Sequence, residues 1–159
     1  MKAFLAGFGF AFQGILYCIK NERNMRIHTV AAIFVLIFAR FFAFDRTEYG
    51  ILLLTIGSVI SAECFNTAIE KLANKVSKEK HPLIKAAKDA AAGGVLVCAI
   101  FSVLIAVVLF SKPEGFENMF VFYTENPLHL AGIVLLGIVS VIYIVMGPVG
   151  IINIFRRKE

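Results

Sequence analysis

Two carboxylates and two carboxamides share one face of a segment that otherwise has the composition of a membrane-spanning helix. At about 100° per residue, Glu63, Asn66, Glu70 and Asn74 project from the same side. Such oxygen donors can hold a hard cation such as Mg²⁺ and orient a nucleophile. A polar seam between packed helices would explain one buried asparagine. It does not explain two carboxylates at membrane depth with no basic residue on their face, so the pattern favours a functional site.

A second polar insertion opens the next apolar stretch. Lys85 and Lys88 share a face there, and Asp89 follows directly. Lysines are expected at the cytoplasmic end of a span, but Lys88 and Asp89 lie deeper than this rule requires, which favours a phosphate-facing Lys88. Upstream, Glu22 and Arg26 are four residues apart and by themselves predict an ordinary ion pair within a helix. Together, the acidic and basic insertions indicate chemistry on a charged substrate at a membrane surface.

Composition defines the class of protein. Of the 159 residues, 59% are hydrophobic, against about 45–50% in soluble domains, which predicts an integral membrane protein of one domain. The net charge of +5 comes from basic residues beside apolar segments, so it predicts membrane orientation and no nucleic-acid partner. The sequence contains no GxxxxGK[ST], GxGxxG or HExxH motif. The three cysteines are isolated in apolar surroundings and predict packing residues.

The apolar segments predict an all-α protein with an N-terminal helix and four membrane spans. Segment 3–19 is slightly short for a span and is interrupted by glycines, so we expect an interfacial helix; a signal peptide or a true span are the alternatives. The predicted spans are 29–44, 49–68, 89–110 and 128–155. A mildly acidic connection precedes the last span, in which Gly147-Pro148 predicts a kink or an early end.

The distribution of charge predicts the orientation of these spans. The N-terminal patch, the loop 71–88 with its six lysines and the C-terminal tail are basic, whereas the connection 111–127 is net negative. With four spans these segments alternate, so both termini and the lysine loop are expected in the cytoplasm. Glu63 and Glu70 would then lie toward the side where ATP and magnesium are available.

Three sequence blocks resemble the prokaryotic diacylglycerol kinase family, most closely its Gram-positive branch, the undecaprenol kinases. In order, the blocks are 21–28 (NERNMRIH), 63–70 (ECFNTAIE) and 81–93 (HPLIKAAKDAAAG). The resemblance covers about residues 1–110. It implies a kinase that uses ATP and Mg²⁺ to phosphorylate a lipid hydroxyl, and a homotrimer whose chains have one surface helix and three spans.

The resemblance also implies a role for each polar site residue. These roles are metal ligands, a general base with its orienting group, and contacts to the nucleotide. In that order, the residues are Glu22 and Glu70; Glu63 and Asn66; and Lys88, Asp89 and Arg26. Phosphoryl transfer is mostly positioning and charge stabilisation, so a metal, a lysine and a carboxylate suffice without a P-loop.

Two features depart from the family pattern. Asn74 stands where the family usually has aspartate, and losing that charge would either weaken binding of metal or nucleotide or shift the burden onto Glu22 and Glu70. Segment 111–159 adds a fourth span that the family core lacks, either outside the trimer or against another membrane protein. We therefore expect a kinase core, residues 1–110, followed by an acidic connection and an extra transmembrane helix with a basic tail.

The expected function is phosphorylation of undecaprenol to undecaprenyl phosphate, at the cytoplasmic side of a bacterial plasma membrane. The same chemistry on diacylglycerol, which would yield phosphatidic acid, is an alternative because the polar residues resemble both branches. Acceptor choice should then lie in an apolar groove between spans. A non-catalytic module that binds nucleotide or a membrane partner is the alternative of another class, for which Asn74 would mark lost activity.

Overall fold

The computed structural model describes residues 2–76 and 81–156, and within these ranges all the regular structure is α-helical. Helices are expected here because lipid offers no partner to backbone polar groups, which must pair within the segment. The helices are α1 (Lys2–Asn21), α2 (Arg23–Ala39), α3 (Arg46–Val76), α4 (Pro82–Leu109), α5 (Pro113–Glu125) and α6 (Pro127–Arg156). The predicted all-α fold is confirmed.

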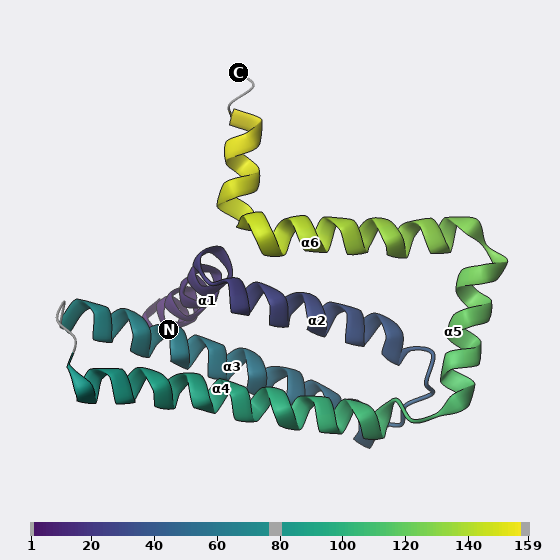
Figure 1. Ribbon diagram of the computed structural model, residues 1–159, viewed down its shortest axis with the longest axis horizontal. Coiled ribbons are helices and arrows are strands. Elements are labelled where there is room, and N and C mark those ends of the chain that lie inside the picture. The colour runs from purple at the N-terminus through teal and green to yellow at the C-terminus, as the bar shows by residue number, and fades with distance from the viewer. Residues whose placement is uncertain (1, 77–80, 157–159) are drawn as a thin grey trace.

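Three helices, α3, α4 and α6, are long and apolar enough to cross a membrane, and the prediction of an integral membrane protein is confirmed. α3 and α4 pack side by side as an antiparallel hairpin (Figure 1). The start of α4 is encoded by His81 and Pro82. His81 is the N-cap residue, and its Nδ1 accepts a hydrogen bond from the backbone N–H of Leu83 at 3.3 Å. Pro82 occupies the first turn, where proline is favoured. Lys78 and Lys80 of the lysine loop lie outside the described residues, as do Arg157 and Lys158 of the tail.

The predicted C-terminal end of the first span, 29–44, is wrong. α2 has 17 residues and ends at Ala39 rather than Phe44. Its length of about 26 Å is slightly below the ~30 Å hydrocarbon core. The chain leaves the helix because Phe42 and Phe44 turn inward, where they are 2% and 9% exposed. Side-chain burial thus outweighs the last helical turn.

An aromatic cluster closes this end of the bundle. Phe42, Phe44 and Phe110 pack edge to face, with centroids 4.7 Å apart for Phe42–Phe110 and 5.2 Å for Phe44–Phe110. Phe116 of α5 lies against Phe42 at 5.0 Å. Ala39, Leu52 and Leu109 are buried in the same core. The cluster joins α2, α3, α4 and α5 at the end opposite the α3–α4 turn.

The predicted acidic connection is a helix, α5, which links α4 to α6 across this end of the bundle (Figure 1). Its start is encoded by Pro113 in the first turn and by Glu114, whose charge suits a helix N-terminus. α6 then runs back beside α2. The predicted break at Gly147-Pro148 is confirmed, because Gly147 has φ 65° and ψ 169° and the chain turns sharply there.

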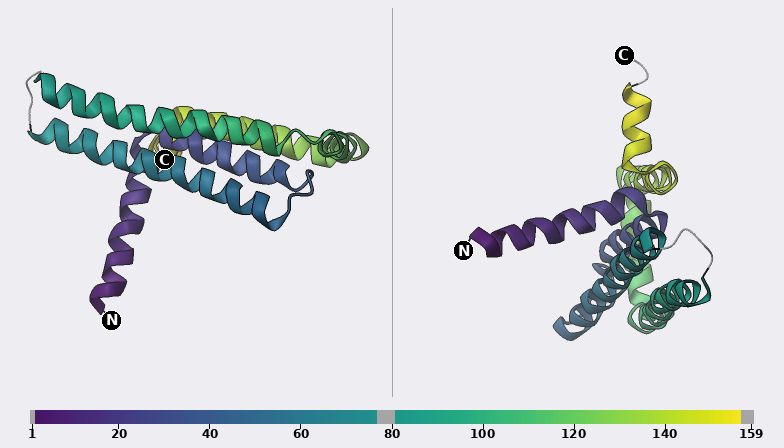
Figure 2. Two further views of the ribbon diagram at one scale, coloured as in Figure 1. Left: turned by 90° about the horizontal axis from the view of Figure 1, so that it is seen from below. Right: turned by 90° about the vertical axis from the view of Figure 1, so that its left-hand side faces the viewer.

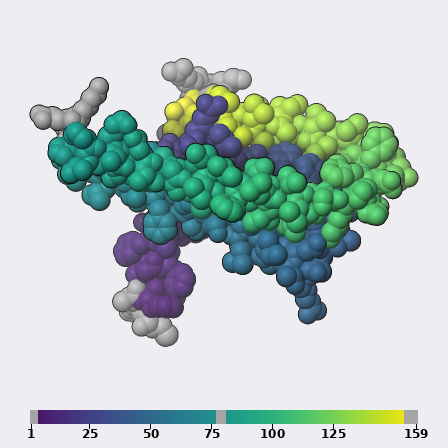
Figure 3. All heavy atoms as spheres, turned by 60° about the horizontal axis from the view of Figure 1, so that its bottom comes forward, coloured from purple at the N-terminus to yellow at the C-terminus, as the bar shows by residue number. Residues whose placement is uncertain are grey.

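α1 stands apart from the other helices. It projects from the bundle with only its C-terminal end in contact (Figures 2 and 3). Phe4, Phe8 and Phe12 on this helix are 62–70% exposed. This placement agrees with the predicted interfacial helix.

Candidate active site

The polar face of α3 passes from the core to the surface. Glu63 and Asn66 are 1% and 9% exposed, Glu70 is half-buried and Asn74 is exposed. The Asn66 amide lies 3.5 Å from Glu70 Oε1, so the four predicted residues do share one face. Glu63 Oε1 and Asn66 Oδ1 are buried and accept no hydrogen bond from the described residues. Buried oxygens whose hydrogen bonds are not made are costly, and a bound ligand is one way to supply the missing partner.

The corner between α1 and α2 brings Glu22 to this face. Glu22 is the N-cap residue of α2, with extended backbone angles, and its Oε1 lies 2.8 Å from Lys71 Nζ on α3. Glu22 and Glu70 are close enough to Glu63 for their charges to repel a negative charge there. Three predicted carboxylates therefore converge from two segments that are forty residues apart or more.

His28 completes this cluster, and the sequence did not single it out. Its Nε2 lies 3.3 Å from Glu63 Oε1. In sequence His28 looks like a residue that borders a span, and only the packing of α2 against α3 reveals its partner. Its place in the block 21–28, two helical turns beyond Glu22, was the one available signal.

Lys88 and Asp89 lie beside the exposed end of the polar face. Lys88 Nζ donates to Asn74 Oδ1 at 3.2 Å, which links α4 to the position where the family usually has aspartate. Asp89 pairs with Lys85 one turn away on its own helix. Lys88 is therefore joined to the α3 face, whereas the recorded partner of Asp89 is local.

Arg26 does not pair with Glu22, contrary to the simplest interpretation of their spacing. Its side chain is buried and directed at backbone carbonyls of α1 and α6. The ion pair of Glu22 is instead made with Lys71.

The residues fit a magnesium ion that arrives with a nucleotide. Among residues 2–76 and 81–156, no three His, Cys, Asp or Glu side chains are grouped to hold a metal by themselves. Mg²⁺ commonly takes only one or two protein carboxylates and completes its shell with water and substrate phosphates. Glu22 and Glu70 could supply these two carboxylates.

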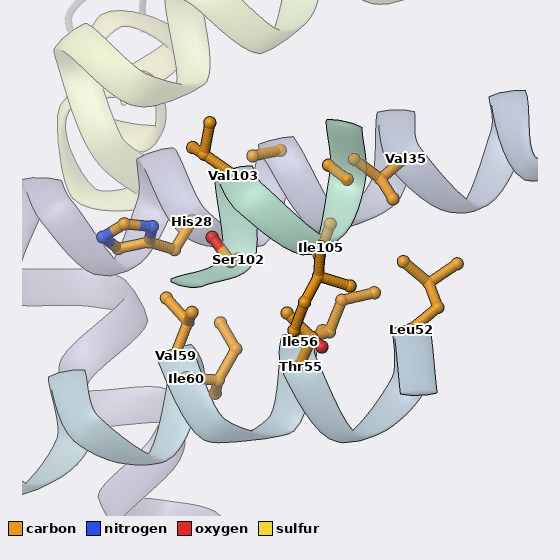
Figure 4. A pocket seen from close by; sticks show the side chains of 13 residues that line it. His28, Val35, Leu52, Thr55, Ile56, Val59, Ile60, Ser102, Val103 and Ile105 are labelled. Atoms are coloured by element: carbon orange, nitrogen blue, oxygen red, sulfur yellow. The ribbon is translucent and has the colours of Figure 1, made fainter. Parts of the chain in front are cut away.

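An apolar groove begins directly below the cluster. It has a volume of about 210 Å³ and is lined by α2, α3 and α4. Figure 4 shows His28 at one end and Leu52 with Val35 at the other. Its two hydroxyl groups are already engaged, since Thr55 donates to the Ile51 carbonyl at 2.7 Å and Ser102 to the Ala99 carbonyl at 2.8 Å. The groove thus offers a hydrocarbon-lined path that ends at His28, whose ring nitrogen lies 3.3 Å from the Glu63 carboxylate.

Known proteins share this part of the chain. A model of the prokaryotic diacylglycerol kinase family matches residues 9–110. The undecaprenol kinase of Bacillus subtilis is 40% identical over 110 residues, which cover 69% of this chain and 89% of that protein. The diacylglycerol kinase of Synechocystis sp. is 36% identical over 110 residues, or 69% and 63% of the two chains. That of Escherichia coli (strain K12) is 27% identical over 101 residues, or 64% and 83%.

The matched segment contains α2, α3, α4 and the C-terminal part of α1, and so includes the converging carboxylates, His28 and the apolar groove. α5 and α6 lie beyond it. The chain therefore belongs to the prokaryotic diacylglycerol kinase family and is a membrane lipid kinase.

Proposed function

We propose that the protein transfers the γ-phosphate of ATP to the hydroxyl of undecaprenol, with Mg²⁺ as the metal. The observation that carries this proposal is the position of Glu63, a buried carboxylate 3.3 Å from His28, which lines one end of an apolar groove. A carboxylate in this place can take a proton from an alcohol whose chain lies in hydrocarbon.

In the proposed reaction, Glu63 accepts the proton of the lipid hydroxyl while the hydroxyl oxygen of the lipid forms a bond to the γ-phosphorus of ATP. The bond from that phosphorus to the ADP oxygen breaks, and ADP leaves. Asn66 orients the hydroxyl and Glu63. Lys88 contacts the phosphates, and Asp89 supports the nucleotide site. Because phosphoryl transfer needs positioning and charge stabilisation above all, this small set of groups is sufficient.

Glu22 and Glu70 would hold Mg²⁺, which supplies neutralisation of phosphate charge when it is bound. For Glu22 to do so, Lys71 must release it and pair elsewhere. Lys71 is well placed for that exchange because it lies at the exposed end of the cluster, where phosphate would arrive from water.

The groove favours undecaprenol over diacylglycerol. Diacylglycerol carries two ester carbonyls close to its hydroxyl, and these need hydrogen-bond donors when they leave water. The Thr55 and Ser102 hydroxyls already donate to backbone carbonyls of their own helices, which leaves His28 as the polar side chain of the lining without such a bond. A polyprenol has only hydrocarbon next to its hydroxyl, so this part of the molecule needs no hydrogen-bond donors from the groove wall. The name of the Bacillus subtilis relative supports the same acceptor.

We further propose that the protein works as a homotrimer in a bacterial plasma membrane, with this site facing the cytoplasm. The family resemblance supports the trimer. The lysines at the α3–α4 end and the glutamates of α5 at the opposite end support the orientation.

The test is transfer of labelled phosphate from ATP by purified protein in mixed micelles, with undecaprenol and diacylglycerol offered in parallel. We expect labelled undecaprenyl phosphate, lost on chelation of Mg²⁺ and lost in Glu63→Gln while that variant still binds nucleotide. If the label appears only in phosphatidic acid, the acceptor is diacylglycerol and not undecaprenol. No label in either lipid, with folded protein and Mg²⁺ present, would support a non-catalytic nucleotide- or partner-binding module.

A further inference from the structure

Two helix ends converge on the side chain of Arg26. α1 ends at Asn21, and the first part of α6 ends at the break beside Gly147. The last carbonyls of a helix lack intrahelical donors and carry partial negative charge. Arg26 Nη1 lies 3.4 Å from the Ile19 carbonyl and 3.2 Å from that of Lys20, and Nε lies 3.2 Å from the Ile144 carbonyl. One guanidinium thus serves both ends.

The break in α6 is built to receive this guanidinium. In a continuous helix the Ile144 carbonyl would accept from the N–H of residue 148, but Pro148 has none. Arg26 Nε supplies the missing donor. Gly147 turns the chain at φ 65°, and a Cβ there would lie 3.1 Å from Arg26 Cζ and Nη1. Glycine is therefore suited to this position both by its backbone angle and by the close approach of Arg26.

We propose that Arg26 is a positioning residue that clasps α6 to the α1–α2 corner and thereby fixes Glu22 for metal binding. Glu22 lies between the carbonyls that Arg26 binds on α1 and Arg26 itself, one turn away on α2. Its backbone is thus held by the same contacts. The metal role of Glu22 rests on the proposed function; the clasp itself rests on the contacts.

The contacts of Arg26 give the C-terminal helix, α6, a role in supporting the site. α6 packs on α2 and on the end of α1, and it lies beyond the residues that match the family. Arg26 is 7% exposed and its recorded contacts are carbonyls. It therefore acts through Glu22 rather than by touching the nucleotide, and α6 becomes part of the support of the site.

The test changes α6 only, in the full-length chain. Gly147→Ala adds a methyl group against Arg26 and strains the backbone, whereas Gly137→Ala, the control, adds the same group to the same helix where nothing lies within 4 Å. We expect Gly147→Ala to raise the Mg²⁺ concentration for half-maximal rate by about tenfold, the size seen when support of a metal ligand is lost. Gly137→Ala should leave it unchanged. Pro148→Ala, which returns a donor to Ile144 without backbone strain, should act in the same direction as Gly147→Ala.

A second readout does not depend on activity. Cys18 is 5% exposed on the last turns of α1. In a chain whose Cys64 and Cys98 are replaced by alanine, we expect a maleimide to alkylate Cys18 severalfold faster in Gly147→Ala than in Gly137→Ala.

Folded variants that change neither readout would overturn the clasp. Faster alkylation with an unchanged Mg²⁺ requirement would overturn its role in placing Glu22. If the parent chain transfers no phosphate, the proposed function fails, and the alkylation of Cys18 still decides the clasp.

Discussion

Glu63 combines two properties that conflict in a purely structural residue. Its side chain is almost fully buried, yet its Oε1 accepts no hydrogen bond from the described residues and lies 3.3 Å from His28. Burying an ionisable group without full pairing opposes folding. This unfavourable burial occurs near the groove through which an alcohol would enter. A group that takes the proton of that alcohol is expected in this place.

His28 should matter to the rate as the one ring nitrogen recorded beside Glu63. We expect His28→Gln to lower kcat by about a hundredfold, because glutamine can neither carry the positive charge that pairs with the Glu63 carboxylate before the transfer nor accept a proton from Glu63 after it. The KM for ATP should stay the same. His129→Gln is the matched control, since His129 stacks on Phe122 in the α5–α6 region, far along the chain from this cluster. Equal rates in the two variants would remove His28 from the reaction.

Asn74 tests the one departure within the polar face. Asn74→Asp would turn the hydrogen bond from Lys88 into an ion pair, and exposed pairs contribute only about 0–1 kcal/mol. We therefore expect initial rates at low ATP to stay the same or to rise modestly. A marked loss of activity would mean that this site has adapted to an uncharged residue.

Sequence alone was enough to predict the shared face of α3, because helical periodicity determines it. It could not predict the partners of Arg26 and His28. The spacing of Glu22 and Arg26 suggested a pair within one helix, but Glu22 caps α2 and faces Lys71, while Arg26 meets carbonyls of two other helices. Such contacts depend on how separate helices pack, which periodicity does not report.

Among the elements, α2, α3 and α4 act together as the walls of the apolar groove. Ala106 of α4 lines it, whereas Val108 on the same helix is 71% exposed. We expect Ala106→Phe to raise the KM for the lipid acceptor by about tenfold through lost space. The KM for ATP should not change. Val108→Phe adds an aromatic ring outside the groove and should change neither value; equal effects of the two substitutions would argue that the acceptor binds elsewhere.

The contact of α5 with the aromatic cluster should be important for stability. A Cβ on Gly115 would lie 2.2 Å from Phe42 Cδ1, so Gly115→Ala must displace a buried ring, at a cost of about 1–3 kcal/mol. We expect a lower midpoint of thermal unfolding in detergent. Gly132→Ala in α6, with open space around it, is the control, and an unchanged midpoint for Gly115→Ala would show that the α5 packing is dispensable.

Element boundaries were predicted less well than element types. The break at Gly147-Pro148 was readable because both residues disfavour a continuous helix. The early end of α2 was not, since Phe41 to Phe44 continue the apolar run and only the core shows that Phe42 and Phe44 leave the helix to fill it. α5 was overlooked although Pro113 and Glu114 are ordinary signals of a helix start.

At the scale of the whole molecule, the distribution of charge supports the proposed orientation in the membrane. Lys71 and Lys75 are in the last turns of α3, and Lys85 and Lys88 are in the first turns of α4. α5, which contains glutamates, lies at the other end of the bundle (Figure 1). In cells expressing chains whose native cysteines are replaced by alanine, an impermeant maleimide should label Glu117→Cys directly. It should label Lys75→Cys only after the cells are permeabilised. Labelling of Lys75→Cys in intact cells would reverse the orientation.

The aromatic cluster of Phe42, Phe44 and Phe110 closes the bundle below the groove. The groove is therefore short. A groove of about 210 Å³ is far smaller than a whole polyprenol, so in the proposed function the end that bears the hydroxyl would occupy it and the rest of the chain would lie in lipid. If undecaprenol is the acceptor, as proposed, only the start of its chain meets the protein, and we expect long and short polyprenols to compete for the enzyme on nearly equal terms.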